Sequence, residues 1–288
     1  MDSRLKGTHM KIGVITDCFK LPLDESLKKA AELGVDGVQI YATSGEFSPE
    51  TLTESRKAEI KQSLKELGLR ISALCGDMGG HGFEIEEDNA ERIEKTCRIL
   101  DLACEFGTNV VTTHIGVIPK DKSVPRYSAM LKALTACGEY AKEKGCMLAI
   151  ETGPEDAATL LQFLNDTKGG VGVNLDPANF VMVAGQDPAE AVRLLKDYIV
   201  HTHAKDGVML KRVNPEYIYG VTPKPEDLQG IKCFKEVPLG EGSVDFTKYL
   251  KALEDVGYRG FLTIEREVGE DPAADIRTAK DHLLSIIG

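Results

Sequence analysis

The sequence predicts an α/β protein whose strands close into a (β/α)8 barrel, the TIM-barrel fold. Short runs rich in β-branched residues alternate with longer amphipathic runs along the whole chain. Several amphipathic runs end at a glycine directly before the next short run, as at Gly34, Gly68 and Gly107. Glycine there supplies the left-handed conformation that terminates a helix. The chain of 288 residues is 42% hydrophobic and 28% charged, which provides for a large core.

Eight strand–helix pairs can be placed in order along the chain. Strands are expected over 11–16, 36–41, 69–75, 109–114, 146–151, 171–176, 198–203 and 260–265. Helices are expected near 23–34, 49–67, 87–106, 124–145, 156–167, 188–196, 244–256 and 271–287. This regular alternation favours one barrel domain over 10–288. A doubly wound open sheet is the competing fold.

Two segments stand outside the alternation. Residues 1–9 are expected to be an expression-tag remnant, because Gly7-Thr8-His9-Met10 reads as a cloning scar. Residues 206–242 hold four prolines and two tyrosines and show no clear helical period. A connection of this length is uncommon unless it has a function. We interpret it as a lid-like insertion over an active site, with a plain surface excursion as the alternative.

The charge balance and the cysteines narrow the class of protein. There are 35 basic and 46 acidic residues, and the resulting net charge of -11 argues against nucleic acid as a partner. No apolar run approaches the roughly 20 residues of a membrane span, so no membrane partner is expected. The seven cysteines contain no CxxC pair. This argues against a disulfide or zinc-ribbon framework and favours a cytoplasmic location.

Polar residues end four successive predicted strands. Glu151 ends the fifth strand, Asp176 the sixth, His203 the seventh and Glu265 the eighth. In a (β/α)8 barrel these strand ends meet at one rim, which is where active sites lie. Three carboxylates at one point would repel each other, and a divalent metal removes that conflict. Carboxylates with one imidazole favour Mn²⁺, with Mg²⁺, Co²⁺ or Zn²⁺ as alternatives.

Taken singly, each of these residues also has an ordinary structural interpretation. Glu151 or Glu265 could form an ion pair at the rim. His203 could be a hydrogen-bonded core histidine, and Asp176, which precedes a proline, could start a turn. The joint pattern favours one shared metal site.

Five segments occur in an order that is typical of one family. They are Glu151-Thr-Gly, Asp176-Pro-Ala-Asn179, His201-Thr-His203-Ala-Lys205-Asp206, Leu239-Gly-Glu-Gly242-Ser-Val-Asp-Phe246 and Ile264-Glu265. Together they resemble the xylose-isomerase-like sugar phosphate isomerase/epimerase superfamily, whose members include ketose 3-epimerases, hydroxypyruvate isomerases and inosose dehydratases. The resemblance covers nearly the whole chain from residue 10 onward. It implies that Glu151, Asp176, His203 and Glu265 are the metal ligands, the same four residues that strand-end position selects.

Residues beside these ligands are candidates for substrate binding. His201, His203 and Lys205 alternate along one strand, so they share a face. Lys205 is therefore expected to reach the substrate, with a solvated rim lysine as the alternative, whereas His201 should lie deeper in a structural role. His114 ends the fourth strand, and His81 follows the third in a glycine-rich stretch. Either histidine could bind sugar hydroxyls, although His114 could also be a buried structural imidazole.

For three further positions near the rim, the sequence does not decide between alternative roles. Many relatives carry a histidine that helps to hold substrate where this chain has Asn179, which leaves the choice between epimerase and dehydratase open. Glu267 is expected either to line the lid or to pair with Arg266. The Gly240-Glu241-Gly242 segment precedes a helix start and could hold a phosphate or form an ordinary N-cap.

These residues lead us to expect a divalent-metal-dependent sugar isomerase or epimerase. Proton transfer next to a ketose carbonyl would pass through a metal-bound enediolate. Glu151 and Glu265, on strands separated by two others, would be the catalytic acid and base on opposite faces of the sugar. The expected partner is a small sugar or sugar-like molecule, and a homodimer or homotetramer is the expected assembly.

Three other functions compete with this expectation. A keto-inositol or keto-sugar dehydratase would use the same metal site. A metal phosphodiesterase acting on abasic DNA would fit the fold, but it needs more histidines and a less acidic chain. A sugar-binding barrel without catalysis is the third alternative.

Overall fold

The computed structural model describes residues 9–288 and confirms the predicted barrel. Eight parallel strands follow one another around it in the order β1-β10-β7-β6-β5-β4-β3-β2. The ring is closed because β1 (Lys11–Ile15) pairs on one side with β2 (Gly37–Tyr41) and on the other with β10 (Phe261–Ile264). A doubly wound sheet would leave two open edges, so that alternative is excluded.

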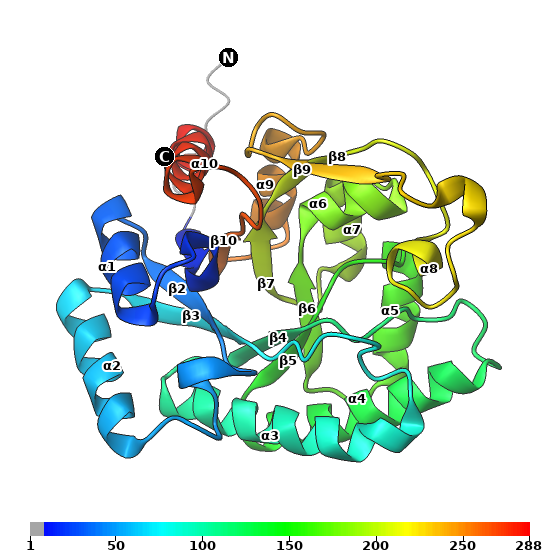
Figure 1. Ribbon diagram of the computed structural model, residues 1–288, viewed down its shortest axis with the longest axis horizontal. Coiled ribbons are helices and arrows are strands. Elements are labelled where there is room, and N and C mark those ends of the chain that lie inside the picture. Colours follow the sequence, from blue (N-terminus) through cyan, green and yellow to red (C-terminus); the bar gives the residue numbers. More distant parts are fainter. Residues whose placement is uncertain (1–8) are drawn as a thin grey trace.

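The remaining barrel strands and the helices lie where the sequence places them, within a few residues. The other strands are β3 (Arg70–Cys75), β4 (Val110–Thr113), β5 (Met147–Glu151), β6 (Val171–Leu175) and β7 (Ile199–Ala204). The helices that flank the strands are α1 (Leu23–Leu33), α2 (Glu54–Leu67), α3 (Asn89–Glu105), α4 (Pro125–Glu143), α5 (Ala157–Asp166), α7 (Pro188–Leu195), α9 (Phe246–Asp255) and α10 (Pro272–Ile287). Figure 1 shows them outside the ring of strands.

Local hydrogen bonding explains where the elements differ from prediction. The helix expected from residue 49 begins at Glu54, because the Thr53 hydroxyl caps it by accepting from the Arg56 amide at 3.2 Å. After β6 the chain forms two short elements that the sequence does not reveal. They are α6 (Pro177–Asn179) and a π-helical turn over Phe180–Ala184. Both are too short to show a helical period in the sequence.

A continuous apolar core fills the space between the strands and the helices. Leu27, Ile60, Leu134, Phe163 and Leu250 come from five different helices and are all fully buried. Burying a side chain of this kind contributes about 1.5–3 kcal/mol. Helix residues of this kind therefore contribute strongly to the stability of the fold.

The barrel interior is polar at its centre. Gln39 of β2 donates from Nε2 to the Thr112 hydroxyl at 3.2 Å. Its Oε1 lies 3.0 Å from Nε2 of His201, which is also 3.0 Å from the hydroxyl of Thr263. Burial lowers the pKa of His201 well below its ordinary value, so this ring is neutral. His201 therefore lies deep in the barrel in a structural setting, as strand periodicity predicts.

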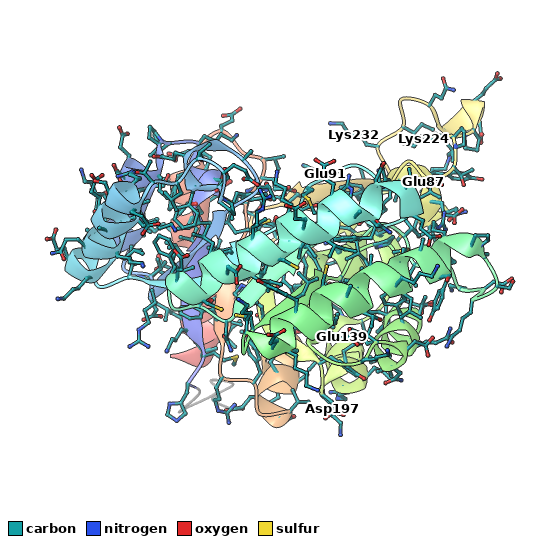
Figure 2. All side chains as sticks on the ribbon, turned by 90° about the horizontal axis from the view of Figure 1, so that it is seen from below. Glu87, Glu91, Glu139, Asp197, Lys224 and Lys232 are labelled. Atoms are coloured by element: carbon teal, nitrogen blue, oxygen red, sulfur yellow. The ribbon has the colours of Figure 1, made fainter. Side chains whose placement is uncertain are left out.

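The segment between β7 and β10 contains a β-hairpin that the sequence does not reveal. Strand β8 (Asp206–Met209) pairs antiparallel with β9 (Phe234–Val237), and α8 (Pro215–Ile218) lies between them. The hairpin contacts α6 and the π-helical turn (Figure 1). Figure 2 shows the part of the insertion that carries Lys224 and Lys232 projecting outward from the rest of the molecule.

Asp206 anchors the C-terminal end of this insertion, where the chain returns to the barrel. Its two carboxylate oxygens accept from the backbone amides of Gly207, Gly240, Gly242 and Val244 at 2.8–3.1 Å. A Cβ atom on Gly242 would lie 2.0 Å from Asp206 Oδ1, so only glycine fits there. The amides of Gly240 and Gly242 are thus occupied by Asp206, and the suggestion that they hold a phosphate is wrong.

Two further observations concern the described part of the chain. No helix within residues 9–288 combines the length and the apolar character needed to cross a membrane. All seven cysteines lie in this part and are free thiols. The proposed tag remnant, residues 1–9, lies outside the described residues except for His9.

Replacing Asp206 tests its role in anchoring the insertion. We expect Asp206→Ala to lower the free energy of unfolding by about 3 kcal/mol, because buried amides lose a charged acceptor. Urea denaturation followed by circular dichroism measures this. The control is Asp227→Ala, an exposed aspartate of the same insertion, for which a change within about 0.5 kcal/mol is expected. Equal stability of the two variants would contradict this role.

Candidate active site

The four predicted metal ligands meet at the C-terminal end of the barrel. Glu151, Asp176, His203 and Glu265 each offer one ligand atom, and these atoms lie within 4.8 Å of one another. All four residues are buried, with exposures between 0% and 7%. They come from the ends of β5, β6, β7 and β10, which are neighbours in the ring. The fold therefore brings into one cluster residues that are far apart in the sequence.

Hydrogen bonds to the backbone fix Asp176. Its Oδ1 accepts from the amide of Ala178 at 2.7 Å and from that of Asn179 at 3.4 Å, so it caps α6. Thr152 joins this residue to β5, because its hydroxyl accepts from the Asp176 amide and donates to the Asp176 carbonyl. Asp176 thus starts a turn, as its ordinary interpretation predicts, and also leaves Oδ2 facing the cluster.

The two ring nitrogens of His203 have different surroundings. Nε2 lies 3.1 Å from Asn174 Nδ2 and 3.2 Å from Gln39 Oε1, and a proton on this nitrogen can be donated to the Gln39 oxygen. Nδ1 lies 3.4 Å from Glu151 Oε1 and 3.0 Å from Glu265 Oε2. A bound cation would displace the proton from Nδ1; a neutral ring with its proton on Nε2 then turns the Nδ1 lone pair into the cluster, which is the arrangement of a metal-ligating histidine.

The cluster contains one buried polar atom without a hydrogen bond from each of its four residues. Glu151 Oε1, Asp176 Oδ2, His203 Nδ1 and Glu265 Oε2 are buried and form no hydrogen bond, although His203 Nδ1 lies within ion-pair distance of the two glutamate oxygens. Buried polar atoms without a hydrogen bond are costly, and the four residues bring their ligand atoms to within 4.8 Å of one another. Three carboxylate oxygens and one imidazole nitrogen are a donor set that suits a divalent cation. The residues present therefore fit the metal that the sequence predicts.

The pKa values show how strongly these groups interact. Burial raises the pKa of Asp176 to about 7. Burial also opposes ionisation of Glu265, but Lys205 and His203 outweigh it and hold the pKa of this carboxyl below its ordinary value. Burial likewise opposes the charged ring of His203, but Glu151 and Glu265 outweigh it and raise its pKa well above the ordinary value. The buried carboxylates of the cluster therefore stabilise positive charge placed beside them.

A cavity of about 240 Å³ opens onto this cluster. Its polar wall includes Asp77, His114, Glu151, His203, Lys205 and Glu265. Its other wall is largely apolar and includes Met182 and Val183 of the π-helical turn, and Ile218, Tyr219 and Phe234 of the insertion. The insertion therefore forms part of the cavity wall.

His114 faces the cluster from β4. Its Nδ1 lies 3.1 Å from Asp77 Oδ2, and its Nε2 lies 3.8 Å from Glu151 Oε1. Burial works against the charged ring, yet Glu151 and Asp77 outweigh it and raise the pKa of His114 to about 9. The Asp77–His114 pair is therefore placed to position or polarise a group beside Glu151.

Lys205 occupies the opposite side of the cluster. Its Nζ donates to Glu267 Oε2 at 2.7 Å and lies 3.4 Å from Glu265 Oε2 and 3.9 Å from Glu236 Oε2. Its side chain is only 7% exposed, which rules out a solvated rim lysine. Glu267 pairs with Lys205 rather than with Arg266. The Arg266 guanidinium instead binds Glu236.

Asn179 and His81, the other two predicted substrate contacts, lie in different settings. Asn179 lines the cavity and donates from Nδ2 to the Thr152 carbonyl at 2.8 Å. His81 is not among the cavity-lining residues, and its Nε2 lies 2.9 Å from Asp88 Oδ2. Within the glycine-rich stretch around it, Gly82 lets the backbone pass close to Ile115, since a Cβ there would lie 2.1 Å from the Ile115 backbone.

Sequence reasoning misses Gln39, Asp77, Tyr219 and Glu236 as residues of this site. For two of these residues the sequence contains a pattern that could have indicated a site. Gln39 is a lone polar residue in an apolar strand, and Asp77 follows β3 just as the ligands follow their strands. Tyr219 and Glu236 lie in the insertion, where no periodicity indicates which side chains turn inward.

The protein is thus a (β/α)8 barrel with a buried cluster of four candidate metal ligands, here called the metal-type cluster, at the C-terminal ends of its strands. The chain belongs to the family described as xylose isomerase-like TIM barrel, whose model matches residues 27–286. This confirms the resemblance that the strand-end motifs indicate.

Individual relatives are distant. An inosose dehydratase of Clostridium botulinum (strain Alaska E43 / Type E3) is 25% identical over 152 residues, 51% of this chain and 48% of that protein. The chain thus aligns with only about half the length of that relative. A fructoselysine 3-epimerase of Escherichia coli O157:H7 is 22% identical over 89% of this chain and 90% of that protein. The crystal structure of a xylose isomerase domain protein from Planctomyces limnophilus has a TM-score of 0.78 and 28% identity, covering 97% of both chains.

Metal binding can be tested directly on the purified chain. We expect Mn²⁺ to raise the melting temperature, because the cation binds the folded cluster alone. Asp176→Asn removes one negative charge, so it should weaken Mn²⁺ binding at least about tenfold in isothermal titration calorimetry. Asp197→Asn is the matched control, because this aspartate is exposed and lies outside the cluster (Figure 2). Equal affinities for Mn²⁺ in the two variants would contradict the assignment.

Proposed function

We propose that the protein is a divalent-metal-dependent sugar isomerase or epimerase that transfers a proton next to a ketose carbonyl. The observation that carries this proposal is the convergence of four buried ligand atoms without hydrogen bonds at the C-terminal end of the barrel. Membership of the xylose isomerase-like family supports it, as does the distant likeness to a fructoselysine 3-epimerase.

Glu151, Asp176, His203 and Glu265 would hold the metal, for which Mn²⁺ is our first choice and Mg²⁺, Co²⁺ or Zn²⁺ are alternatives. When bound, such an ion acts as a Lewis acid that stabilises the negative charge developing on the carbonyl oxygen during proton removal. The cavity beside the cluster is lined by groups that can position a small polyhydroxy substrate.

Glu151 and Glu265 are the proposed acid and base. They end β5 and β10, between which β6 and β7 lie in the ring. Their carboxylates therefore approach the cavity from different sides of the cluster. One carboxylate would remove the proton from the carbon next to the carbonyl, and the other would deliver a proton to the opposite face. Removal of the proton from one face of that carbon and delivery of a proton to the opposite face inverts the stereocentre.

His114 and Lys205 give these two carboxylates different surroundings. His114, held by Asp77, lies 3.8 Å from Glu151, whereas Lys205 lies 3.4 Å from Glu265. We assign both cations to substrate contact, where each can donate to a hydroxyl or a carbonyl oxygen. Asn179 lines the same cavity and would add an uncharged hydrogen-bonding group.

The insertion would act as a lid. Ile218, Tyr219 and Phe234 come from it and form one wall of the cavity. An apolar cover of this kind excludes water from the reacting groups, which strengthens electrostatic interactions inside. We propose this role for residues 206–242 as part of the single barrel domain over 10–288.

The alternative is a dehydratase that removes water from a keto-inositol or keto-sugar. It is favoured by the likeness to an inosose dehydratase over 152 residues. Both reactions begin with removal of a proton next to a carbonyl, so the same residues would serve. The dehydratase would produce an enone absorbing in the ultraviolet, whereas the epimerase would produce an isomer of the same mass.

Isosteric replacement of the two carboxylates tests the acid–base assignment. Glu151→Gln and Glu265→Gln should each lower kcat at least about a hundredfold, because an amide cannot take up the proton. Glu139→Gln is the matched control on the outer helix α4, with no expected change (Figure 2). Turnover near the wild-type value in either of the first two variants would remove that residue from the mechanism.

Proton exchange identifies the substrate class. In heavy water with added Mn²⁺, a panel of ketoses and keto-inositols should yield one compound labelled with deuterium at a single carbon next to the carbonyl. Mass spectrometry and nuclear magnetic resonance locate the label. A labelled isomer supports the epimerase, and a product lighter by one water supports the dehydratase. Metal binding without label in any compound would favour a sugar-binding barrel.

The assembly and location of the protein stay predictions. We expect a homodimer or homotetramer, which light scattering of the purified chain measures. We expect the protein in the cytoplasm, with a sugar or sugar-like molecule rather than nucleic acid or a membrane as its partner.

A further inference from the structure

A second cavity lies at the other end of the barrel from the metal-type cluster. It has a volume of about 500 Å³, which is in the range of small-molecule sites. Its lining includes Arg70, the first residue of β3, whereas Cys75, the last residue of that strand, lines the catalytic cavity. The two cavities are therefore separated by the length of the strands. We call this one the N-terminal cavity.

The lining of the N-terminal cavity carries basic residues and no carboxylate. Lys11, Lys61, Lys65, Arg70 and Arg259 line it, without any aspartate or glutamate. Among residues 9–288, none of these five cations has a carboxylate oxygen within 4.0 Å, although many other lysines and arginines of the chain do. A chain with 46 acidic and 35 basic residues thus leaves a group of unpaired cations around one cavity.

Aromatic rings hold two of these cations at the lining. The Lys11 ammonium lies 5.5 Å from the centre of the Phe261 ring, and the Lys61 ammonium lies 5.1 Å from the centre of the Phe106 ring. Both rings line the same cavity. Lys61 and Lys65 are four residues apart on α2, a spacing at which like charges repel. An anion between them would relieve that repulsion.

The rest of the lining suggests what kind of anion fits. Asn109 offers an amide group, while Leu64 and Phe106 offer apolar surface. The hydroxyls of Ser72 and Thr108 also lie at the lining but already donate to backbone carbonyls. A phosphate group is doubly charged near neutral pH and accepts several hydrogen bonds, which lysine and arginine supply. We propose that the N-terminal cavity binds a small phosphorylated molecule that also carries an apolar or aromatic part.

A structural explanation competes with this proposal. Strand N-termini follow the C-terminal ends of the helices, and cations there offset the partial negative charge of a helix end. Lys65 lies in the last turn of α2 and would have this effect. That effect stabilises the fold without any ligand. Binding and stability must therefore be measured separately.

Phenyl phosphate is a suitable probe, because it combines a dianion with an aromatic ring. Isothermal titration calorimetry on the full chain loaded with Mn²⁺ should show binding that weakens as salt is added. The double variant Lys61→Gln/Lys65→Gln should lose at least about tenfold in affinity, since it removes two charged donors. Lys28→Gln/Lys142→Gln is the matched control, because these exposed lysines lie on α1 and α4 outside the cavity. It carries the same change in net charge and should bind like the wild type.

Three results would overturn the proposal. Absence of phenyl phosphate binding by the wild type leaves only the helix-end explanation, whatever the melting temperatures are. Equal affinity in Lys61→Gln/Lys65→Gln and the wild type places the probe elsewhere, including the catalytic cavity. Equal affinity for phenol and phenyl phosphate shows that the cations do not take part.

Discussion

Three buried carboxylates facing one point are the constraint on which the C-terminal end of this barrel depends. Glu151, Asp176 and Glu265 cannot all be ionised at such short range without compensating charge. Lys205 supplies one positive charge from the same end of the barrel. Against the effect of burial, Glu151 and Glu265 raise the pKa of His203 well above its ordinary value, so they stabilise positive charge inside the cluster, which a divalent cation would supply. The metal-type site is thus a consequence of electrostatics as much as of ligand identity.

The same constraint extends outward into the insertion. Lys205 lies near Glu236 of β9, and Glu236 accepts from the Arg266 guanidinium at 2.7 Å. Arg266 in turn binds Asp275 of α10 at 2.7 Å. Alternating charges therefore connect the cluster to the hairpin and to the last helix. Asp206 fixes the other end of the hairpin by accepting four backbone amides. The insertion that walls the cavity is held by these ionic and hydrogen-bonding contacts together with apolar packing, in which Ile218 and Tyr219 lie against Met182 and Val183.

The polar barrel interior connects the two ends of the molecule. Gln39 Oε1 lies close to Nε2 of both His201 and His203. One amide therefore sets the orientation of a structural histidine and of a metal-type ligand. His201 also lines the N-terminal cavity. The hydrogen bonds of Gln39 at the centre of the barrel therefore adjoin both the N-terminal cavity and the cluster of metal-ligand candidates. Packing only apolar side chains here would leave the His203 ring without a partner that fixes its tautomer.

The sequence by itself determined the barrel and its four ligand candidates. Alternating strand and helix patterns are local, and the end of a strand can be recognised from neighbouring residues, as at Glu151 and Asp176. Alternation along β7 likewise placed His203 and Lys205 on one face. Only the tertiary structure decided which distant side chains meet. It paired His114 with Asp77 and Lys205 with Glu267, turned His81 toward Asp88, and folded residues 206–209 and 234–237 into a hairpin. Such contacts depend on long-range packing and charge compensation, which no local pattern records.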